Sequence, residues 1–316
     1  MSGFAFYAGF LAFVLAMLLV DLKFFHAEAE VPSAKQSAGW VAVWVGLAVA
    51  FGLIVYFLQG RHDAAAYFAG YLIEYSLSVD NIFVFLVIFN YFKVPAAYQH
   101  RVLFFGILGA IVFRGLFIAV GTTLINRFEW IIYVLGALLI FTAYRLLRGA
   151  TDIHPEDNPV LKLFKRRFKT TTTYDGQKLF TFQNGKRLAT PLFVVLLMIE
   201  TTDIVFAVDS IPAIFAITRD PFIVLTSNVF AVLGLRALYF LLAGVMDRLR
   251  LLKYGLAVIL GFVGVKMLLG GIWHPPIALS LGVIVGVLTV TAVLSLIVKP
   301  KQDGQAGAPS SESIER

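Results

Sequence analysis

Residues 73–82 read IEYSLSVDNI, and residues 202–211 read TDIVFAVDSI. Each stretch holds an acid, five further residues, a second acid, a small polar residue and isoleucine. Both stretches lie inside long apolar runs, where insertion of a charged side chain costs roughly 2.5–3.5 kcal/mol at the centre of a membrane helix. Matched acids in such an environment indicate a shared role. The four acids are Glu74, Asp80, Asp203 and Asp209.

The composition of the chain is that of a polytopic membrane protein. Its 316 residues are 59% hydrophobic and only 14% charged, and the mean hydropathy is +0.86, whereas a soluble domain is about a quarter charged. The net charge of +7 lies in loops between apolar runs, so we expect contact with a lipid bilayer and none with nucleic acid. The absence of cysteine excludes disulfides, thiolate metal sites and cysteine nucleophiles.

Apolar runs predict an all-α fold of about nine transmembrane helices in a single domain, residues 1–298. The first run lacks the basic start and cleavage site of a signal peptide, so we expect it to stay as a helix. A polar tail, 299–316, is expected to be disordered. The expected helices are Phe4–Leu22, Trp40–Leu58, Ala64–Phe92, Val102–Leu124, Trp130–Leu147, Pro191–Ile217, Phe222–Val245, Leu251–Gly270 and Pro275–Val298.

One long polar loop, residues 149–190, interrupts the apolar runs. Within it, Pro159–Lys169 has an apolar face and a basic remainder, which suits a short helix on the anionic inner leaflet or a plain topology anchor. Lys178–Phe182 and Lys186–Thr190, joined through Asn-Gly, predict a small β-hairpin.

Positive charges predict the orientation of the chain. Of the 26 Lys and Arg residues, 20 fall in loops that share one side of the membrane and three fall in loops on the other. By the positive-inside rule the N-terminus is outside and the C-terminus is in the cytosol, as an odd number of helices requires.

The two acidic stretches belong to a longer internal repeat. Asp209 follows Asp80 by 129 positions, Arg236 follows Arg114 by 122, and Lys266 follows Arg145 by 121. Repeat 1 is about 64–148 and repeat 2 about 191–270, each with three spans, so the second copy enters the membrane from the opposite side. The sequence thus predicts a 3+3 inverted-topology repeat of helices 3–5 and 6–8, with a site between the repeats near the midplane.

The inversion predicts how the acids are layered. Six residues along a helix rise about 9 Å, and the two acidic helices run in opposite directions. We therefore expect Glu74 to lie level with Asp209, and Asp80 to lie level with Asp203. Breaks in the helices near Asn81, Ser210 and Pro212 would free carbonyl groups for an ion.

The side chains within the helices favour a hard divalent cation. Five acids against three bases leave two surplus negative charges, and the five histidines all fall in loops or at helix ends. Oxygen ligands suit Mn²⁺, Mg²⁺ or Ca²⁺. The candidate metal ligands are Glu74, Asp80, Asn81, Glu200, Asp203, Asp209 and Ser210, and the charge-balancing residues are Arg114, Arg236 and Lys266. Asn228, at the expected start of a helix, is a weaker accessory ligand, since such residues are usually solvated or capping.

Several stretches around these residues resemble the TerC/Alx family of bacterial integral membrane proteins, and the Alx members most closely. The resemblance covers nearly all of the chain except the tail. It implies a multi-pass protein of the bacterial inner membrane, related to the lysine-exporter superfamily, that exports manganese through the acids of the third and sixth helices. The stretches are Gly70–Glu74, Val79–Asn81, Glu200–Asp203, Ala207–Ala216, Asp220–Asn228, Leu233–Arg236 and Leu252–Leu256.

Together these patterns predict a secondary transporter that exports divalent cations, Mn²⁺ first, by proton-coupled alternating access. We expect no cofactor and no enzymatic activity. The chain has no Gly-x-x-x-x-Gly-Lys-Ser/Thr phosphate loop, and protons are the simplest coupling ion. The alternative is an assembly or scaffold factor linked to tellurium resistance, in which the acids form structural ion pairs. The oligomeric state stays open.

Overall fold

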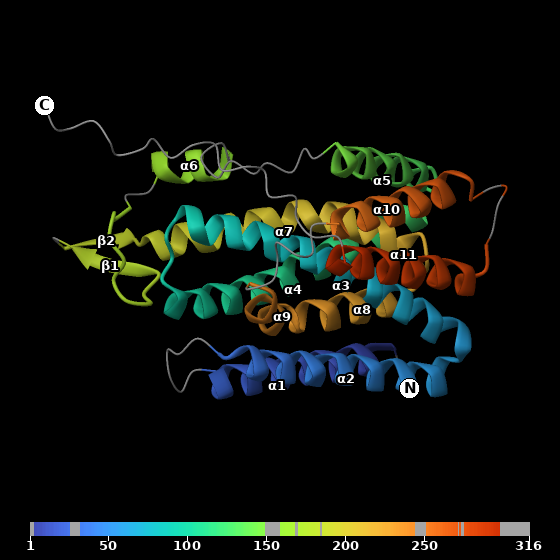
Figure 1. Cartoon of the computed structure of the whole chain (residues 1–316), viewed down its shortest axis with the longest axis horizontal. Coiled ribbons are helices and arrows are strands. Elements are labelled where there is room, and N and C mark those ends of the chain that lie inside the picture. Colours follow the sequence, from blue (N-terminus) through green and yellow to red (C-terminus); the bar gives the residue numbers. More distant parts are fainter. Residues whose placement is uncertain are drawn as a thin grey trace, which may run out of the picture.

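The computed structural model describes residues 3–25, 32–148, 159–167, 170–183, 185–243, 251–270, 272 and 275–297. Helices dominate these ranges, and one short hairpin joins them (Figure 1). The expected disordered tail, 299–316, lies outside the described residues. The elements are α1 (Gly3–Phe25), α2 (Ala34–Gln59), α3 (Arg61–Tyr91), α4 (Ala96–Arg127), α5 (Ile131–Leu147), α6 (Pro159–Arg167), β1 (Phe180–Gln183), β2 (Lys186–Ala189), α7 (Pro191–Phe215), α8 (Pro221–Leu233), α9 (Leu235–Leu242), α10 (Leu252–Leu268) and α11 (Ile277–Ile297).

Local sequence explains where several helices begin. Ser33 and Gln36 form a capping box at the start of α2, in which Ser33 Oγ accepts from the Gln36 amide at 3.3 Å. Asp220 caps α8 by accepting from the Phe222 amide at 2.8 Å. Pro191 opens α7 at a position where its missing N–H group leaves no bond unmade.

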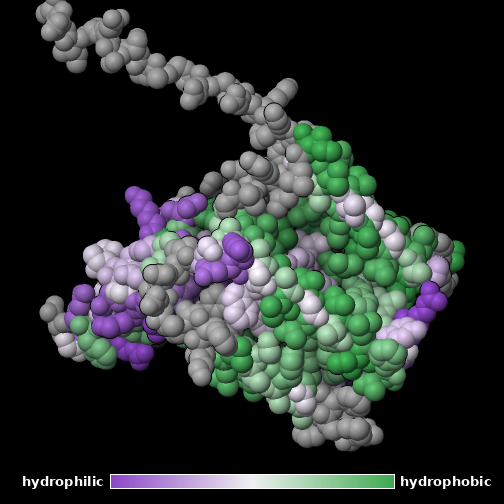
Figure 2. Space-filling model, turned by 60° about the horizontal axis from the view of Figure 1, so that its bottom comes forward, coloured by the Kyte–Doolittle hydropathy of each residue, from purple (hydrophilic) through white to green (hydrophobic). Residues whose placement is uncertain are grey.

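Six described helical stretches are long and apolar enough to cross a membrane, judged by length and composition. Residues Tyr7–Val20 of α1 and the whole of α5 are shorter apolar helices. Apolar side chains cover most of the face seen in Figure 2, and most of the hydrophilic side chains on that face gather at the end that carries the hairpin. The chain is thus a multi-pass membrane protein, while the count of nine spans stays a prediction.

Helix α3 and the α8–α9 segment are the most buried of the long helical stretches, and α7 lies beside α3. Helix α3 packs extensively on α8, α7 packs extensively on α4, and α3 and α7 also contact each other. Helices α5 and α10 form the closest pair on one side, and α1 and α2 lie along the opposite side (Figure 1). The first helix of each predicted repeat therefore packs on the second helix of the other repeat: α3 on α8, and α7 on α4. The inverted-topology repeat itself stays a prediction.

Helices α3 and α7 are continuous at the positions where the sequence predicted breaks. Helix α3 runs through Asn81, and α7 runs through Ser210 and Pro212 to Phe215. The break falls instead in the expected seventh helix, between α8 and α9 at Gly234, whose Cα lies against Trp44 of α2. A Cβ on Gly234 would lie 3.3 Å from Trp44 Cβ, so glycine permits the close packing there.

The predicted hairpin is present, and it covers one end of the bundle. Strands β1 and β2 pair antiparallel, and Gly185 adopts a φ of 69° in the turn. Tyr174 donates to the Phe92 carbonyl at 2.8 Å, and this bond ties the segment before the hairpin to the end of α3. On α6, Phe164 packs against Phe193 of α7. Leu161 and Phe164 of α6 therefore lie against the protein, and the alternatives of an inner-leaflet helix and a plain topology anchor stay predictions.

Candidate functional site

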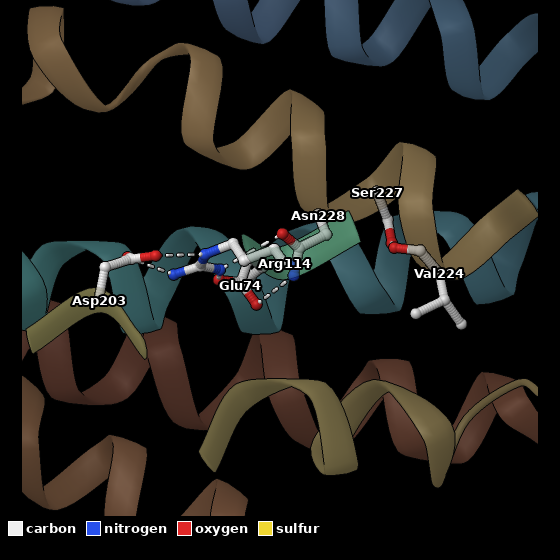
Figure 3. A network of polar contacts seen from close by, with 6 residues as sticks. All are labelled: Glu74, Arg114, Asp203, Val224, Ser227 and Asn228. Atoms are coloured by element: carbon white, nitrogen blue, oxygen red, sulfur yellow. Dashed lines mark hydrogen bonds and ion pairs between the residues drawn. The ribbon is translucent and has the colours of Figure 1, made fainter. Parts of the chain in front are cut away.

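A guanidinium group lies between two carboxylates where α3, α4 and α7 meet (Figure 3). Arg114 on α4 donates from Nε to Asp203 Oδ2 at 3.1 Å and from Nη2 to Asp203 Oδ1 at 2.9 Å. Its Nη1 forms an ion pair with Glu74 Oε1 on α3. All three side chains are at most 3% exposed. Burial makes each of these charge-assisted contacts stronger than it would be in water.

Asn228 of α8 completes this network. Its Nδ2 donates to Glu74 Oε2 at 3.0 Å, and its Oδ1 accepts from Arg114 Nη1 at 3.3 Å. Asn228 is fully buried in the middle of α8, whose N-cap is Asp220. The expectation that Asn228 is a solvated or capping residue at a helix start is therefore wrong. We call Glu74, Arg114, Asp203 and Asn228 the central network.

The central network joins acids at equivalent positions of the predicted repeat. Asp203 follows Glu74 by the same 129 positions that separate Asp80 and Asp209. One guanidinium bridges Glu74 and Asp203, and these two acids are displaced from each other along the direction of the helices (Figure 3). Gly70 of α3 lies against Ile214 of α7, and in these antiparallel helices that register sets Glu74 near the level of Asp209 and Asp80 near the level of Asp203, in agreement with the two predicted layers. Six residues of helix place the second acid of each helix about 9 Å away along its axis.

Asp209 lies apart from the central network. Its Oδ1 accepts from Thr142 Oγ1 of α5 at 2.9 Å, and Arg145 is close enough to act on its charge. The Asp80 side chain is outside the described part of the chain. Its neighbour Asn81 is buried, as is Ser210 beside Asp209, and neither Asn81 Nδ2 nor Ser210 Oγ has a hydrogen-bond partner among the described residues.

Glu200 lies on α7 three positions before Asp203 and faces α4. Its carboxylate sits directly over Gly109, where a Cβ would overlap both carboxylate oxygens. Glu200 Oε2 is buried and has no hydrogen-bond partner among the described residues. The residue is nevertheless half-buried as a whole. No described arginine contact therefore neutralises the charge of the Glu200 carboxylate.

The two other predicted charge-balancing residues differ from Arg114. Arg236 of α9 is buried within the bundle, with 2% of its surface exposed. Lys266 of α10 donates to Ser280 of α11 at 3.0 Å. The described contact of Lys266 is therefore a hydroxyl and not one of the acids, and its charge-balancing role stays a prediction.

The described side chains form no group of three or more His, Asp or Glu residues that is close enough to hold a metal ion. The central network instead holds a positive charge of the protein's own between two acids. Two carboxylates against one guanidinium leave one formal negative charge there. Chemically, the site attracts cations and supplies carboxylate and amide oxygens, which are ligands for Mn²⁺, Mg²⁺ or Ca²⁺.

Sequence reasoning undervalued Asn228 and missed Thr142 and Gly109. A signal for Asn228 was present, because it interrupts the apolar run of α8, where a polar side chain in hydrocarbon needs a partner. Thr142 and Gly109 carry no such signal. Threonine can satisfy its hydroxyl on its own helix, and glycine is common in membrane helices.

Comparisons with known proteins agree with these observations. A family model described as "Integral membrane protein TerC family" matches residues 59–303. A membrane protein of Myxococcus xanthus is 49% identical over 292 residues, which cover 92% of each chain. A protein of Escherichia coli K12, which carries the name "Putative membrane-bound redox modulator Alx", is 47% identical over 311 residues, 95% of this chain and 97% of its own.

A chloroplast relative extends the comparison to plants. The thylakoid membrane protein TERC of Arabidopsis thaliana is 48% identical over 267 residues, 84% of this chain and 70% of its own. No solved structure matches the chain.

Proposed function

The chain belongs to the TerC family of integral membrane proteins, and on this premise we propose that it is a secondary transporter that exports divalent cations, Mn²⁺ first. The acids of α3 and α7 are the ion ligands, and the protein carries out no chemical reaction on its cargo. The protein resides in the bacterial inner membrane with its N-terminus outside and its hairpin end in the cytosol.

One observation carries this proposal. The positively charged guanidinium of Arg114 is held between Glu74 of α3 and Asp203 of α7, the two helices that the predicted repeat relates. Midplane sites between repeats are typical of secondary transporters. Further acids on the same helices, Glu200 and Asp209, offer oxygen ligands along the path. Carboxylates in hydrocarbon are retained where they bind or move charge.

Coupling to protons gives the export its driving force. Moving a divalent ion out against an inside-negative potential costs about 4.6 kcal/mol at 100 mV, from about 2.3 kcal/mol per charge. Inward proton flow onto the same carboxylates offsets this cost. The chain contains no phosphate-binding loop that would allow ATP to do so.

The redox name of the Escherichia coli relative suggests a different reading, which the composition of this chain restricts. Thiol–disulfide exchange needs cysteine, and the chain has none. A redox effect of this protein would therefore not use thiol–disulfide exchange, and under the proposed function it would follow from the movement of redox-active manganese.

The test is Mn²⁺ efflux from reconstituted vesicles with the pH gradient varied. We expect efflux that rises with the inward proton gradient and is lost in Asp209→Asn. Asp63, a partly exposed acid in the first turn of α3, offers the matched control Asp63→Asn, which should leave efflux unchanged. Efflux that ignores the pH gradient would remove proton coupling, and efflux that survives Asp209→Asn would remove the proposed path.

A scaffold or assembly role is the second candidate, and the closure of the central network favours it. If Glu74, Arg114 and Asp203 serve only to lock helices together, their replacement should lower stability and assembly while metal has no effect. Whole-cell metal content with and without Glu74→Gln, compared across Mn²⁺, Mg²⁺ and Ca²⁺, separates this candidate from transport.

A further inference from the structure

We infer that Arg114 is a tethered counter-cation, which occupies the acids of α3 and α7 when no divalent ion is bound and leaves them when the ion arrives. The inference rests on the proposed transport of divalent cations and adds to it the identity of the group that stabilises the empty carrier. It assigns Arg114 a positioning role in place of a fixed structural one.

The geometry of the guanidinium supports this role. Arg114 makes two bonds to Asp203 and one ion pair to Glu74, so it engages both repeat-related acids at once. An ion that bound these acids would need the same oxygen atoms. Arg114 and a divalent cation would also repel each other at such short range. The two cations therefore compete for one place.

The origin of the three side chains allows the competition to be reversible. Arg114 comes from α4, whereas the acids come from α3 and α7 (Figure 3). A shift of α4 against the other two helices withdraws the guanidinium without moving either acid along its own helix. Asn228 of α8 contacts both Glu74 and Arg114, and it can keep Glu74 oriented during the exchange.

Charge balance explains why an empty carrier needs this cation. Without Arg114 or a metal ion, two buried carboxylates would face each other at the centre of the membrane. Like charges in a buried site disfavour ionisation and strain the packing. Arg114 lets the carrier return without metal while the coupling protons are carried by the other acids of α7, Glu200 and Asp209, so a neutral side chain at this position should block the metal-free return while it leaves the metal-loaded movement intact.

The decisive experiment compares net Mn²⁺ efflux with Mn²⁺/Mn²⁺ exchange in vesicles that contain the full chain. For Arg114→Met we expect net efflux to be lost and exchange to be retained, because exchange never needs the empty carrier. Arg127→Met is the matched control on the same helix, since Arg127 is exposed at the end of α4, and it should leave both fluxes unchanged.

A second variant keeps the inference testable if Arg114→Met does not fold. Arg114→Lys retains the charge but cannot bind Asp203 through two parallel bonds. It should keep net efflux and lower the half-saturating Mn²⁺ concentration about tenfold, the equivalent of one charge-assisted hydrogen bond. Arg127→Lys is its control.

The opposite results are equally clear. Loss of both fluxes in a folded Arg114→Met protein, or retention of both, would overturn the counter-cation role, as would unchanged or weaker Mn²⁺ saturation in Arg114→Lys. Wild-type vesicles that neither release nor exchange Mn²⁺ would refute the proposed function itself, and the counter-cation role with it.

Discussion

At the scale of single residues, the molecule is defined by charges buried in hydrocarbon. Arg114 and Arg236 are among its largest fully buried side chains, and Glu74 is fully buried as well. A buried ion pair contributes little net stability, but removal of one partner leaves an uncompensated charge. The central network is therefore more sensitive to substitution than its small size suggests.

The two acids of the central network should respond unequally. Asp203→Asn loses one of the two parallel bonds to Arg114 and should lower the free energy of unfolding by about 3–5 kcal/mol, as is typical when one partner of a buried pair is removed. Glu74→Gln should lower it less, since its amide oxygen can still accept from Asn228 or Arg114. Chemical unfolding in detergent measures both, and an equal loss would contradict the asymmetry.

Gly109 should be required for the position of Glu200. In Gly109→Ala the new methyl group overlaps the Glu200 carboxylate, which has to turn away. We expect Mn²⁺ efflux to fall strongly while the thermal unfolding temperature changes little, because Glu200 is half-buried and can move. Gly115→Ala on the same helix is the control, since its nearest atom would be 4.0 Å away. A full-rate Gly109→Ala transporter would exclude Glu200 from the path.

At the scale of elements, close contact between helices depends on glycine where α5 crosses α10. A Cβ at Gly264 would lie 2.9 Å from the Gly136 carbonyl oxygen, and a Cβ at Gly136 would lie 3.1 Å from the Gly264 carbonyl oxygen. Small residues allow backbones to approach in this way within membranes, where packing replaces the hydrophobic effect as the driving force.

We therefore expect Gly264→Ala to force α5 and α10 apart and to lower the free energy of unfolding by about 1–3 kcal/mol, the usual range for overpacking. Gly261→Ala, one turn earlier, should be nearly neutral because its closest contact would be Ala143 Cβ at 3.9 Å. Unfolding in detergent compares the two. Equal stability of the two variants would show that the crossing tolerates separation.

The hairpin segment should loosen in acid. Thr181 donates to the Asp175 carboxylate at 2.7 Å, and Lys178 donates to the same carboxylate at 3.2 Å. These two bonds hold the pKa of Asp175 below its usual value. Because the pKa of Asp175 is lowered in the folded state, the stability that these bonds contribute is fully present above the pKa of the unfolded chain. It is lost as the pH falls through the pKa of the folded state. Hydrogen exchange of the hairpin amides should therefore quicken, beyond the intrinsic pH effect, in that acidic range. Asp175→Asn should remove this extra pH dependence.

At the scale of the whole molecule, reciprocal packing of the two halves is the main feature. Helix α3 packs on α8, and α7 packs on α4. Neither predicted repeat can therefore bury its own first helix, α3 or α7, without the other repeat. The acids meet only where this exchange of partners brings α3 and α7 together. Assembly of the site and assembly of the fold are thus one event.

The predicted orientation can be tested without background labelling, because the chain has no cysteine. Gln177→Cys, next to the hairpin, should react with a membrane-impermeant maleimide only from the cytosolic side. Arg219→Cys, in the turn between α7 and α8, should react only from the outside. Labelling of both from one side would contradict the predicted topology.

The sequence by itself determined the membrane class, the apolar helices, the hairpin and the family, because hydropathy, turn residues and motifs are local properties of the chain. It also identified the buried acids and their common offset, since charge is rare in apolar runs. Only the tertiary structure decided that Glu74 and Asp203 share Arg114, that Asn228 joins them, and that Asp209 turns to α5. The relative height and rotation of helices depend on close packing between distant segments, and no local pattern in the sequence encodes that packing.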